Sequence, residues 1–188
     1  MESKFVPLYT HGFIFGFLTG IDNDYLANTC IKNYHKRVSD KSHVTQSEDI
    51  SIPEDKNIIK IATELGLAYK KHFNKALNVL QEHWSQVHYK NESTQFHDHL
   101  GHDTDMVGVY YVKAPPNSGD LILRYKKHEF DRSEWILSPQ ENKFIMFEPG
   151  MVHGVTPNKS EEPRICISMN FKIDNKRSNK YNSWGINI

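Results

Sequence analysis

The chain has 188 residues, of which 38% are hydrophobic and 12% aromatic, and its 23 acidic side chains balance 23 basic ones. This length and composition predict one globular domain with its own core and exclude a disordered chain. The lack of net charge gives no indication of nucleic acid or an anionic membrane as a partner, because such partners favour a basic surface.

The cysteines and the N-terminal apolar segment bear on the compartment. Cys30 and Cys166 stand far apart without a CxxC pair, which argues against a disulfide framework and a thiolate metal site and fits a reducing environment. The apolar stretch 12–21 is too short to span a bilayer and lacks the basic start and cleavage site of a signal peptide. We interpret it as a buried strand and expect a soluble, cytoplasmic protein.

The first half of the sequence predicts helices after that strand. Asp22 offers a helix cap, and apolar residues at helical spacing predict a helix from residue 25 to about residue 37. Residues 38–56 are polar and aperiodic, which is typical of a long surface loop. Helical spacing resumes at residue 55 and continues to about residue 80, which predicts the longest helix.

The second half changes to short β-rich segments separated by turn residues. We predict seven strands, at residues 83–89, 94–99, 106–114, 120–125, 143–147, 150–155 and 164–173. Strands of this number and length indicate a β-sandwich or barrel, so the expected fold is mainly β with N-terminal helices packed against it. The single domain then consists of a strand and helices (1–82), a β core (83–173) and a polar tail (174–188).

Histidine is frequent, with eleven in the chain and five of them between positions 83 and 102. His97 and His99 flank Asp98 in a predicted strand, where side chains alternate between faces, so both imidazoles are expected to point the same way. His153 lies in an otherwise apolar strand, where a histidine without a partner is costly. Because neutral imidazole is a common metal ligand, these three histidines form a candidate metal centre with open positions.

Simpler interpretations of these histidines remain open. The HxH pair could lie on a polar surface, and His153 could be a hydrogen-bonded core residue. We expect no special role for His83, His88 and His102, although His88 shares a predicted strand face with Gln86 and could line a pocket.

The chemistry-bearing motifs follow one order along the chain. His97-Asp-His99 is followed by GVYYVKAPPNSG (108–119), FEPGMVHGVTPN (147–158) and RICISMN (164–170). This order and spacing resemble the 2-oxoglutarate and iron(II)-dependent oxygenase superfamily. The sequence is most similar to the small bacterial and phage-type members and more distantly similar to the prolyl hydroxylases. The resemblance covers about residues 84–173.

The resemblance implies a double-stranded β-helix (jelly-roll) with iron(II) held by His97, His99 and His153. Arg164 stands eleven residues after His153, where the family places the basic residue that binds the far carboxylate of the co-substrate 2-oxoglutarate. A guanidinium suits this role because its planar N–H groups match a carboxylate. The further co-substrate contacts implied by the resemblance are Tyr111, Ser168, Asn170, Val155 and, less directly, Gln86.

The function implied by the resemblance is a dioxygenase of the hydroxylase type. Such an enzyme converts 2-oxoglutarate and O₂ to succinate and CO₂ while it oxidises a substrate, so O₂ and an unidentified substrate are the expected partners. The sequence selects neither the substrate nor the oligomeric state. Residues 38–56 and 126–140 are the candidate substrate lid, because long loops often serve that purpose.

One position departs from the family pattern, which has a carboxylate where His99 stands. Three neutral ligands leave iron(II) with its full charge, whereas a carboxylate offsets part of it. Asp103 or Asp105, in the following loop, could supply that carboxylate. The alternatives are a three-histidine jelly-roll enzyme that does not use 2-oxoglutarate, including a zinc enzyme, and a non-catalytic metal-stabilised binding module.

Arg164 also has an alternative interpretation. The acidic neighbours Glu161 and Glu162 could hold it at the surface in an ion pair, which is the usual environment of an arginine beside acids. Arg124 would then be the spare anchor for a carboxylate.

Overall fold

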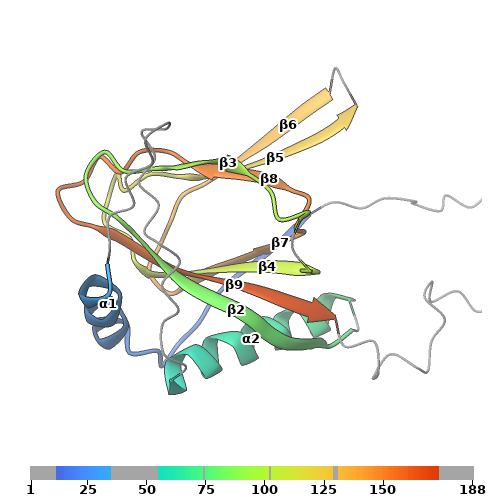
Figure 1. The fold of residues 1–188 in the computed structure, drawn as a ribbon, viewed down its shortest axis with the longest axis horizontal. Helices are drawn as coiled ribbons and strands as arrows, with labels where there is room; N and C mark the ends of the chain where they lie inside the picture. Colours follow the sequence, from blue (N-terminus) through green and yellow to red (C-terminus); the bar gives the residue numbers. More distant parts are fainter. Residues whose placement is uncertain (1–11, 35–54, 74, 102, 129–130, 174–188) are drawn as a thin grey trace, which may run out of the picture.

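The computed structural model describes residues 12–34, 55–73, 75–101, 103–128 and 131–173. In these residues, nine strands form two antiparallel sheets that face each other, and two helices cover the outer face of the larger sheet (Figure 1). This is the predicted jelly-roll packed on N-terminal helices. Most of the predicted loop 38–56, and all of the predicted tail 174–188, fall outside the described residues.

The two sheets bring together strands that are distant in the sequence. The larger sheet has the order β1 (Phe13–Phe17), β7 (Lys143–Phe147), β4 (Met106–Lys113), β9 (Arg164–Ile173), β2 (Leu77–His88). The smaller sheet has the order β3 (Thr94–His97), β8 (Val152–Val155), β5 (Leu121–His128), β6 (Asp131–Leu137). The register pairs the end of β2 with the start of β9 and places β3 beside β8.

Both helices begin at an aspartate that caps the first turn. The Asp22 side chain accepts a hydrogen bond from the Tyr25 N–H (3.0 Å) at the start of α1 (Asn23–Lys32). The Asp55 side chain accepts one from the Ile58 N–H (2.9 Å) at the start of α2 (Lys56–Phe73). Such caps satisfy N–H groups that have no partner within the helix. Neither helix is long and apolar enough to cross a membrane, among the residues described.

The predicted end of the second helix at residue 80 is wrong. The helix ends at Phe73, and Leu77 and Leu80 belong to β2, where they pair with Ile173 and Phe171 of β9. A few apolar residues fit a helical and a strand period equally well, so long-range pairing with β9 determines the structure here.

Two further predictions need correction. The N-terminal strand is present as β1, but it is not buried: it lies at the edge of the larger sheet, and Phe15 and Phe17 are 60% and 56% exposed. The segment 126–140, predicted as a loop and lid, continues β5 and forms β6, which pair as a hairpin. In the described part of β6 the consecutive residues Glu134, Trp135 and Ile136 are all exposed, so this edge strand has no alternation of buried and exposed positions that the sequence could reveal.

The larger sheet is buried on both faces, which explains the continuous apolar run in β4. Met106, Tyr110 and Val112 contribute to the core against the helices, whereas Val107 and Val109 contribute to the core between the sheets. At Gly108 an added Cβ would lie 2.6 Å from the Leu65 side chain of α2. Glycine therefore allows the close approach of helix and sheet.

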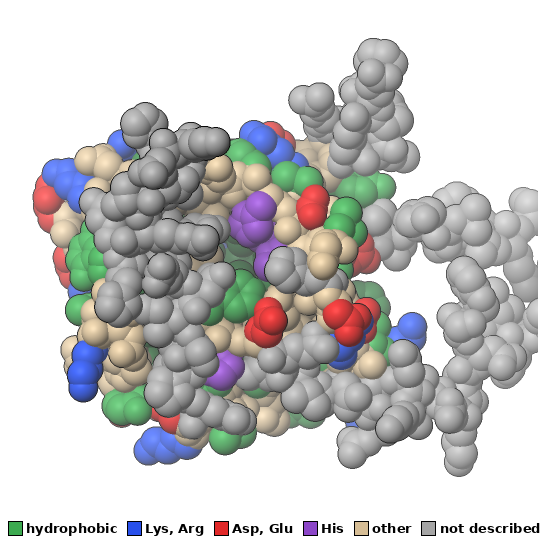
Figure 2. Space-filling view, viewed as in Figure 1, with side chains coloured by type: hydrophobic (Ala, Val, Ile, Leu, Met, Phe, Trp, Pro, Cys, Tyr) green, Lys and Arg blue, Asp and Glu red, His purple; other side chains and the backbone are tan. Residues whose placement is uncertain are grey.

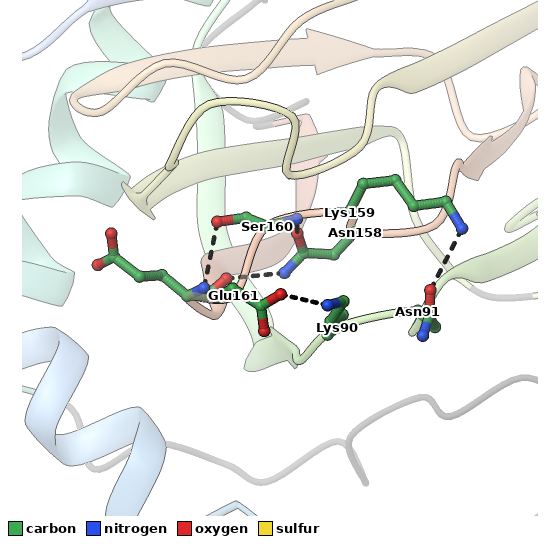
Figure 3. A network of polar contacts seen from close by, with 7 residues as sticks. Lys90, Asn91, Asn158, Lys159, Ser160 and Glu161 are labelled. Carbon is green, nitrogen blue, oxygen red and sulfur yellow. Dashed lines mark hydrogen bonds and ion pairs between the residues drawn. The ribbon is translucent and has the colours of Figure 1, made fainter.

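A network of polar contacts fixes the end of β2 to the start of β9 (Figure 3). Asn158 is fully buried and donates from Nδ2 to the carbonyl oxygens of His88 (2.8 Å) and Glu162 (2.9 Å). Its Oδ1 accepts from the Ser160 N–H (2.8 Å). Around it, Lys90 pairs with Glu161 at the surface. Because every polar atom of this buried amide is paired, the network holds both strand ends in place.

Replacement of Asn158 with alanine is expected to lower the free energy of unfolding by about 2–4 kcal/mol, because the buried His88 carbonyl and the partly buried Glu162 carbonyl lose their donor. Urea unfolding of the metal-free protein measures this effect. Lys159→Ala is the matched control, since the Lys159 ammonium donates to the Asn91 side chain at the surface (3.2 Å) and its backbone bond is kept in alanine. The control should change stability by less than about 0.5 kcal/mol. Equal effects of the two variants would contradict the assigned role of Asn158.

Candidate metal centre and co-substrate cavity

Three histidines from separate segments meet between the two sheets. His97 ends β3, His153 lies in the neighbouring β8, and the two are direct cross-strand partners. One potential ligand atom from each of His97, His99 and His153 lies within 4.8 Å of the others. The ring centroids of His97 and His153 are 4.2 Å apart, and His99 lies 5.3 and 5.1 Å from them. This spacing allows one ion to contact all three imidazoles.

His99 reaches this cluster by a different route from the one predicted. The predicted strand 94–99 ends at His97, so the alternation of side chains within a strand does not place His99. Instead, its backbone N–H donates to the Pro149 carbonyl (2.8 Å) and its ring stacks against Trp84, with centroids 6.2 Å apart. The turn before β8 therefore positions the ligand that follows β3.

Hydrogen bonds fix which ring nitrogen of two of these histidines is available. His97 Nδ1 lies 2.8 Å from the Gln95 carbonyl oxygen, and His153 Nδ1 lies 2.9 Å from the Met151 carbonyl oxygen. A carbonyl only accepts, so Nδ1 carries the proton and Nε2 keeps its lone pair for a metal. Burial, and then the neighbouring His97, lower the pKa of His153 to about 3, so its ring is neutral as metal ligation requires.

The carboxylates considered for this centre lie elsewhere. Asp103 forms an ion pair with Lys172, and Asp105 accepts from the Ile173 N–H (2.9 Å) and lies 3.7 Å from the Lys172 ammonium. Among the described residues, the group close enough to share one ion consists of the three histidines. The donor set therefore fits iron or another metal that accepts imidazole nitrogen, without a carboxylate ligand.

One cavity is lined by the three histidines and by Arg164. Figure 2 shows histidine side chains (purple) beside a hollow on this face of the molecule. Four residues of the predicted co-substrate site line the cavity together with Arg164: Gln86, Tyr111, Val155 and Ser168. Asn170 is not among the lining residues; it is buried, and its amide donates to Glu82 (3.3 Å).

Arg164 points into the protein and not toward its acidic neighbours. It is 1% exposed, whereas Glu161 pairs with Lys90 and Glu162 pairs with Lys113 (2.6 Å). The interpretation of Arg164 as a surface ion pair is therefore wrong. One Nη atom approaches the Gly119 carbonyl oxygen (3.4 Å), and Nε has no hydrogen-bond partner among the described residues. A buried guanidinium with an unused donor has the chemistry to bind an anion.

The spare arginine lies at the surface. Arg124 pairs with Glu134 (2.6 Å) and its guanidinium carbon lies 3.3 Å from the centre of the Phe96 ring. This arginine is therefore occupied outside the cavity.

The two adjacent tyrosines face opposite sides of β4. The Tyr110 hydroxyl donates to Asn23 or Asn142 (3.0 Å each) on the helix side of the sheet, as expected for a core aromatic residue. Tyr111 faces the cavity and is 2% exposed. Burial raises the pKa of Tyr111, and nearby Arg164 offsets only part of the rise, so its hydroxyl keeps its proton and can donate to a ligand.

The sequence interpretation assigned no role to Trp84, Thr94 and His88, which lie at or behind this cavity. Thr94 and Trp84 line it, and His88 lies behind Arg164, with Nδ1 directed at the guanidinium. A signal was present, because Trp84, Gln86 and His88 alternate along one strand and therefore share a face. Without the pairing of β2 with β9, however, that face could not be assigned to the cavity.

Comparison with known proteins supports the class of protein that this fold and site define. Residues 82–170 match the family described as "Putative 2OG-Fe(II) oxygenase". The match spans the jelly-roll core with its three histidines and Arg164, and it confirms the resemblance to the 2-oxoglutarate and iron(II)-dependent oxygenases. Iron(II) and 2-oxoglutarate are the cofactor and co-substrate of that family. No curated protein sequence matches this chain significantly.

Solved structures with a similar fold include a Pseudomonas putida prolyl-4-hydroxylase (17% identity, TM-score 0.63), with 87% of this chain and 93% of that chain covered. A prolyl hydroxylase from Trichoplax adhaerens, in complex with a peptide fragment of hypoxia inducible factor, has 12% identity and a TM-score of 0.64, with 92% and 89% covered. The alpha-ketoglutarate-dependent epimerase SnoN of nogalamycin biosynthesis has 14% identity and a TM-score of 0.67, with 86% and 77% covered. At these identities the likeness shows the fold.

Proposed function

We propose that this chain is an iron(II)- and 2-oxoglutarate-dependent dioxygenase of the hydroxylase type. His97, His99 and His153 hold the iron, and Arg164, Ser168 and Tyr111 hold the far carboxylate of 2-oxoglutarate. Val155 forms an apolar wall and Gln86 a polar one. O₂ and an oxidisable substrate of unknown identity complete the reaction.

The observation that carries this proposal is that a cluster of imidazoles and a buried guanidinium line the same cavity. Three imidazoles converge at one end of the cavity. At the other lies a buried guanidinium whose Nε has no hydrogen-bond partner in the part of the chain that the structure describes. A keto acid with a second carboxylate fits both ends, because its keto-acid group suits a metal and its far carboxylate suits a guanidinium. A buried, unpaired charge is costly, so Arg164 strongly favours an anionic ligand.

The side chains around the cavity have different tasks in the proposed site. The proton-bearing Tyr111 hydroxyl and the Ser168 hydroxyl donate to the same carboxylate as Arg164 and fix its orientation. Leu121 and Val155 line the cavity between the two ends and exclude water. When bound, iron and 2-oxoglutarate supply the oxygen-activating chemistry, which the protein itself lacks. Asn170 donates to Glu82, its cross-strand partner on β2, and is not among the residues that line the cavity.

The direct test adds iron(II), 2-oxoglutarate and O₂ to the purified protein with candidate substrates. The proposal predicts that an accepted substrate gives release of succinate and CO₂ in equal amounts, with the second oxygen atom of O₂ used to oxidise that substrate. Failure of 2-oxoglutarate to bind the anaerobic iron(II) protein would overturn the proposal.

A three-histidine enzyme that does not use 2-oxoglutarate is the second candidate. It is favoured by one observation, the lack of a carboxylate at the metal centre among the described residues. In that case the metal would bind as proposed, but the metal-loaded protein would not bind 2-oxoglutarate. The metal bound after purification under anaerobic conditions separates zinc from iron enzymes.

Replacement of His99 distinguishes a ligand from a packing residue. His99→Ala is expected to weaken iron(II) binding about 100-fold or more, because it removes one of three ligands. His99→Asp should stay within about tenfold of the wild type, since a carboxylate is a good ligand for iron and offsets part of its charge. Anaerobic titration with iron(II) gives both affinities. If the two variants bound iron equally well, His99 would not be a ligand.

A further inference from the structure

His88 lies directly behind Arg164, outside the set of residues that line the cavity. It ends β2, is fully buried and is the cross-strand partner of Arg164, so the two side chains project from the same face of the sheet. Its Nδ1 contacts the Nη2 atom of Arg164, and its Nε2 lies 3.1 Å from the Thr94 hydroxyl oxygen. The ring therefore links the guanidinium to a hydroxyl that lines the same cavity.

The chemistry of the two partners determines the tautomer of this ring. A guanidinium has N–H donors and no acceptor, so the Nδ1 that faces Arg164 must be unprotonated and accept a hydrogen bond. In a neutral imidazole the proton then resides on Nε2, which donates to the Thr94 oxygen. Because that oxygen already accepts from His88, the proton of the Thr94 hydroxyl remains available for a ligand in the cavity.

We propose that His88 is a positioning residue of the carboxylate site, whose neutral ring orients both the Arg164 guanidinium and the Thr94 hydroxyl toward the far carboxylate of 2-oxoglutarate. This inference rests on the proposed function. It adds Thr94 to the residues that contact the co-substrate and assigns a role to His88, for which the sequence predicted none.

The charge of the site supports this role. Burial, and then the positive charge of Arg164, lower the pKa of His88 well below its usual value, so the ring stays neutral. Among the described residues no acidic side chain pairs with Arg164, since Glu161 and Glu162 are paired with lysines. A carboxylate in place of His88 would hold the guanidinium equally well but would neutralise it. A neutral acceptor holds Arg164 and leaves its charge for the ligand.

The position of His88 is itself fixed. Its carbonyl oxygen accepts from the buried Asn158 amide (2.8 Å), which also donates to the Glu162 carbonyl oxygen in the loop before Arg164 (2.9 Å). One side chain thus holds the backbone of His88 and the loop that leads into Arg164, which limits the freedom of the ring to turn away from the guanidinium.

A matched pair of variants tests the importance of a neutral acceptor. His88→Asn and His88→Asp have the same size and both place an oxygen near Arg164, but only the second carries a charge. Calorimetric titration of the anaerobic manganese(II) protein gives the affinity for 2-oxoglutarate and for 2-oxobutyrate, which lacks the far carboxylate. We expect His88→Asp to bind 2-oxoglutarate at least tenfold more weakly than His88→Asn, and both variants to bind 2-oxobutyrate equally. Thr94→Val should weaken only 2-oxoglutarate binding, by about fivefold or more.

Equal affinities of the aspartate and asparagine variants for 2-oxoglutarate would overturn the inference. Absence of 2-oxoglutarate binding by the wild-type protein would instead overturn the proposed function. The tautomer is tested without any ligand, by long-range proton–nitrogen correlation spectra of the histidine-labelled wild-type protein, with His88→Asn used to assign the signal. A neutral His88 ring with its proton on Nε2 is the expected result, and a proton on Nδ1 contradicts the proposal. This test does not depend on the folding of His88→Asp.

Discussion

Replacement of His153 with alanine is expected to weaken iron(II) binding at least about 100-fold while the protein remains folded. His153 is 6% exposed, and the hydrogen bond from Nδ1 to the Met151 carbonyl directs Nε2 toward the other two imidazoles. Two remaining nitrogen ligands hold a divalent ion far less tightly than three. Anaerobic titration with iron(II), followed by determination of the bound metal, measures the loss.

The same variant separates an enzyme from a metal-stabilised binding module. His72→Ala is the control, because His72 is an exposed histidine at the end of α2, away from the metal centre. It should retain full metal binding. If His153→Ala lost metal and all turnover but unfolded at the same temperature as the metal-free wild type, the metal would serve chemistry. If instead the wild-type protein showed no turnover and unfolded at a much lower temperature without metal, the metal-stabilised binding module would be favoured.

Replacement of Arg164 with methionine is expected to weaken binding of 2-oxoglutarate about 100-fold or more, with little change in iron(II) affinity. Charge-assisted hydrogen bonds contribute about 1.5–3 kcal/mol each, and a guanidinium can make two to one carboxylate. Methionine keeps most of the buried side-chain volume without the charge, so the fold should tolerate it. Anaerobic calorimetric titration of the metal-free protein with iron(II), and then of the iron(II) protein with 2-oxoglutarate, gives the two affinities.

Arg124→Met is the matched control for this substitution. Arg124 lies on β5, pairs with Glu134 at the surface and does not line the cavity. Its replacement should leave 2-oxoglutarate binding within about twofold of wild type, because exposed ion pairs contribute little. If Arg164→Met bound 2-oxoglutarate normally, or if Arg124→Met lost the same affinity, the far carboxylate would not lie on Arg164.

The residues that could be predicted from the sequence are those with a strong local pattern. The strands at 143–147 and 164–173 have the predicted bounds because their apolar runs end at clear turn residues. Alternation within the last strand places Arg164, Cys166, Ser168 and Asn170 on one face, and the first three of them line the cavity. The ordered motifs then predicted that His97, His99 and His153 would meet.

The remaining features depend on contacts between distant segments. The start of β2 at Leu77 follows from its pairing with β9, and the strand β6 follows from its pairing with β5. The position of His99 depends on the Pro149 carbonyl, fifty residues further along the chain. His88 could not be assigned a role because only the register between β2 and β9 places it against Arg164. Periodicity describes one segment at a time and contains no such information.

A crystal structure of the manganese(II) form with 2-oxoglutarate, prepared without oxygen, tests the central claim most directly. We expect one metal ion bound by His97, His99 and His153, the keto acid on that ion, and the far carboxylate within hydrogen-bonding distance of Arg164. A metal ion elsewhere, or a carboxylate that does not contact the Arg164 guanidinium, would contradict the account.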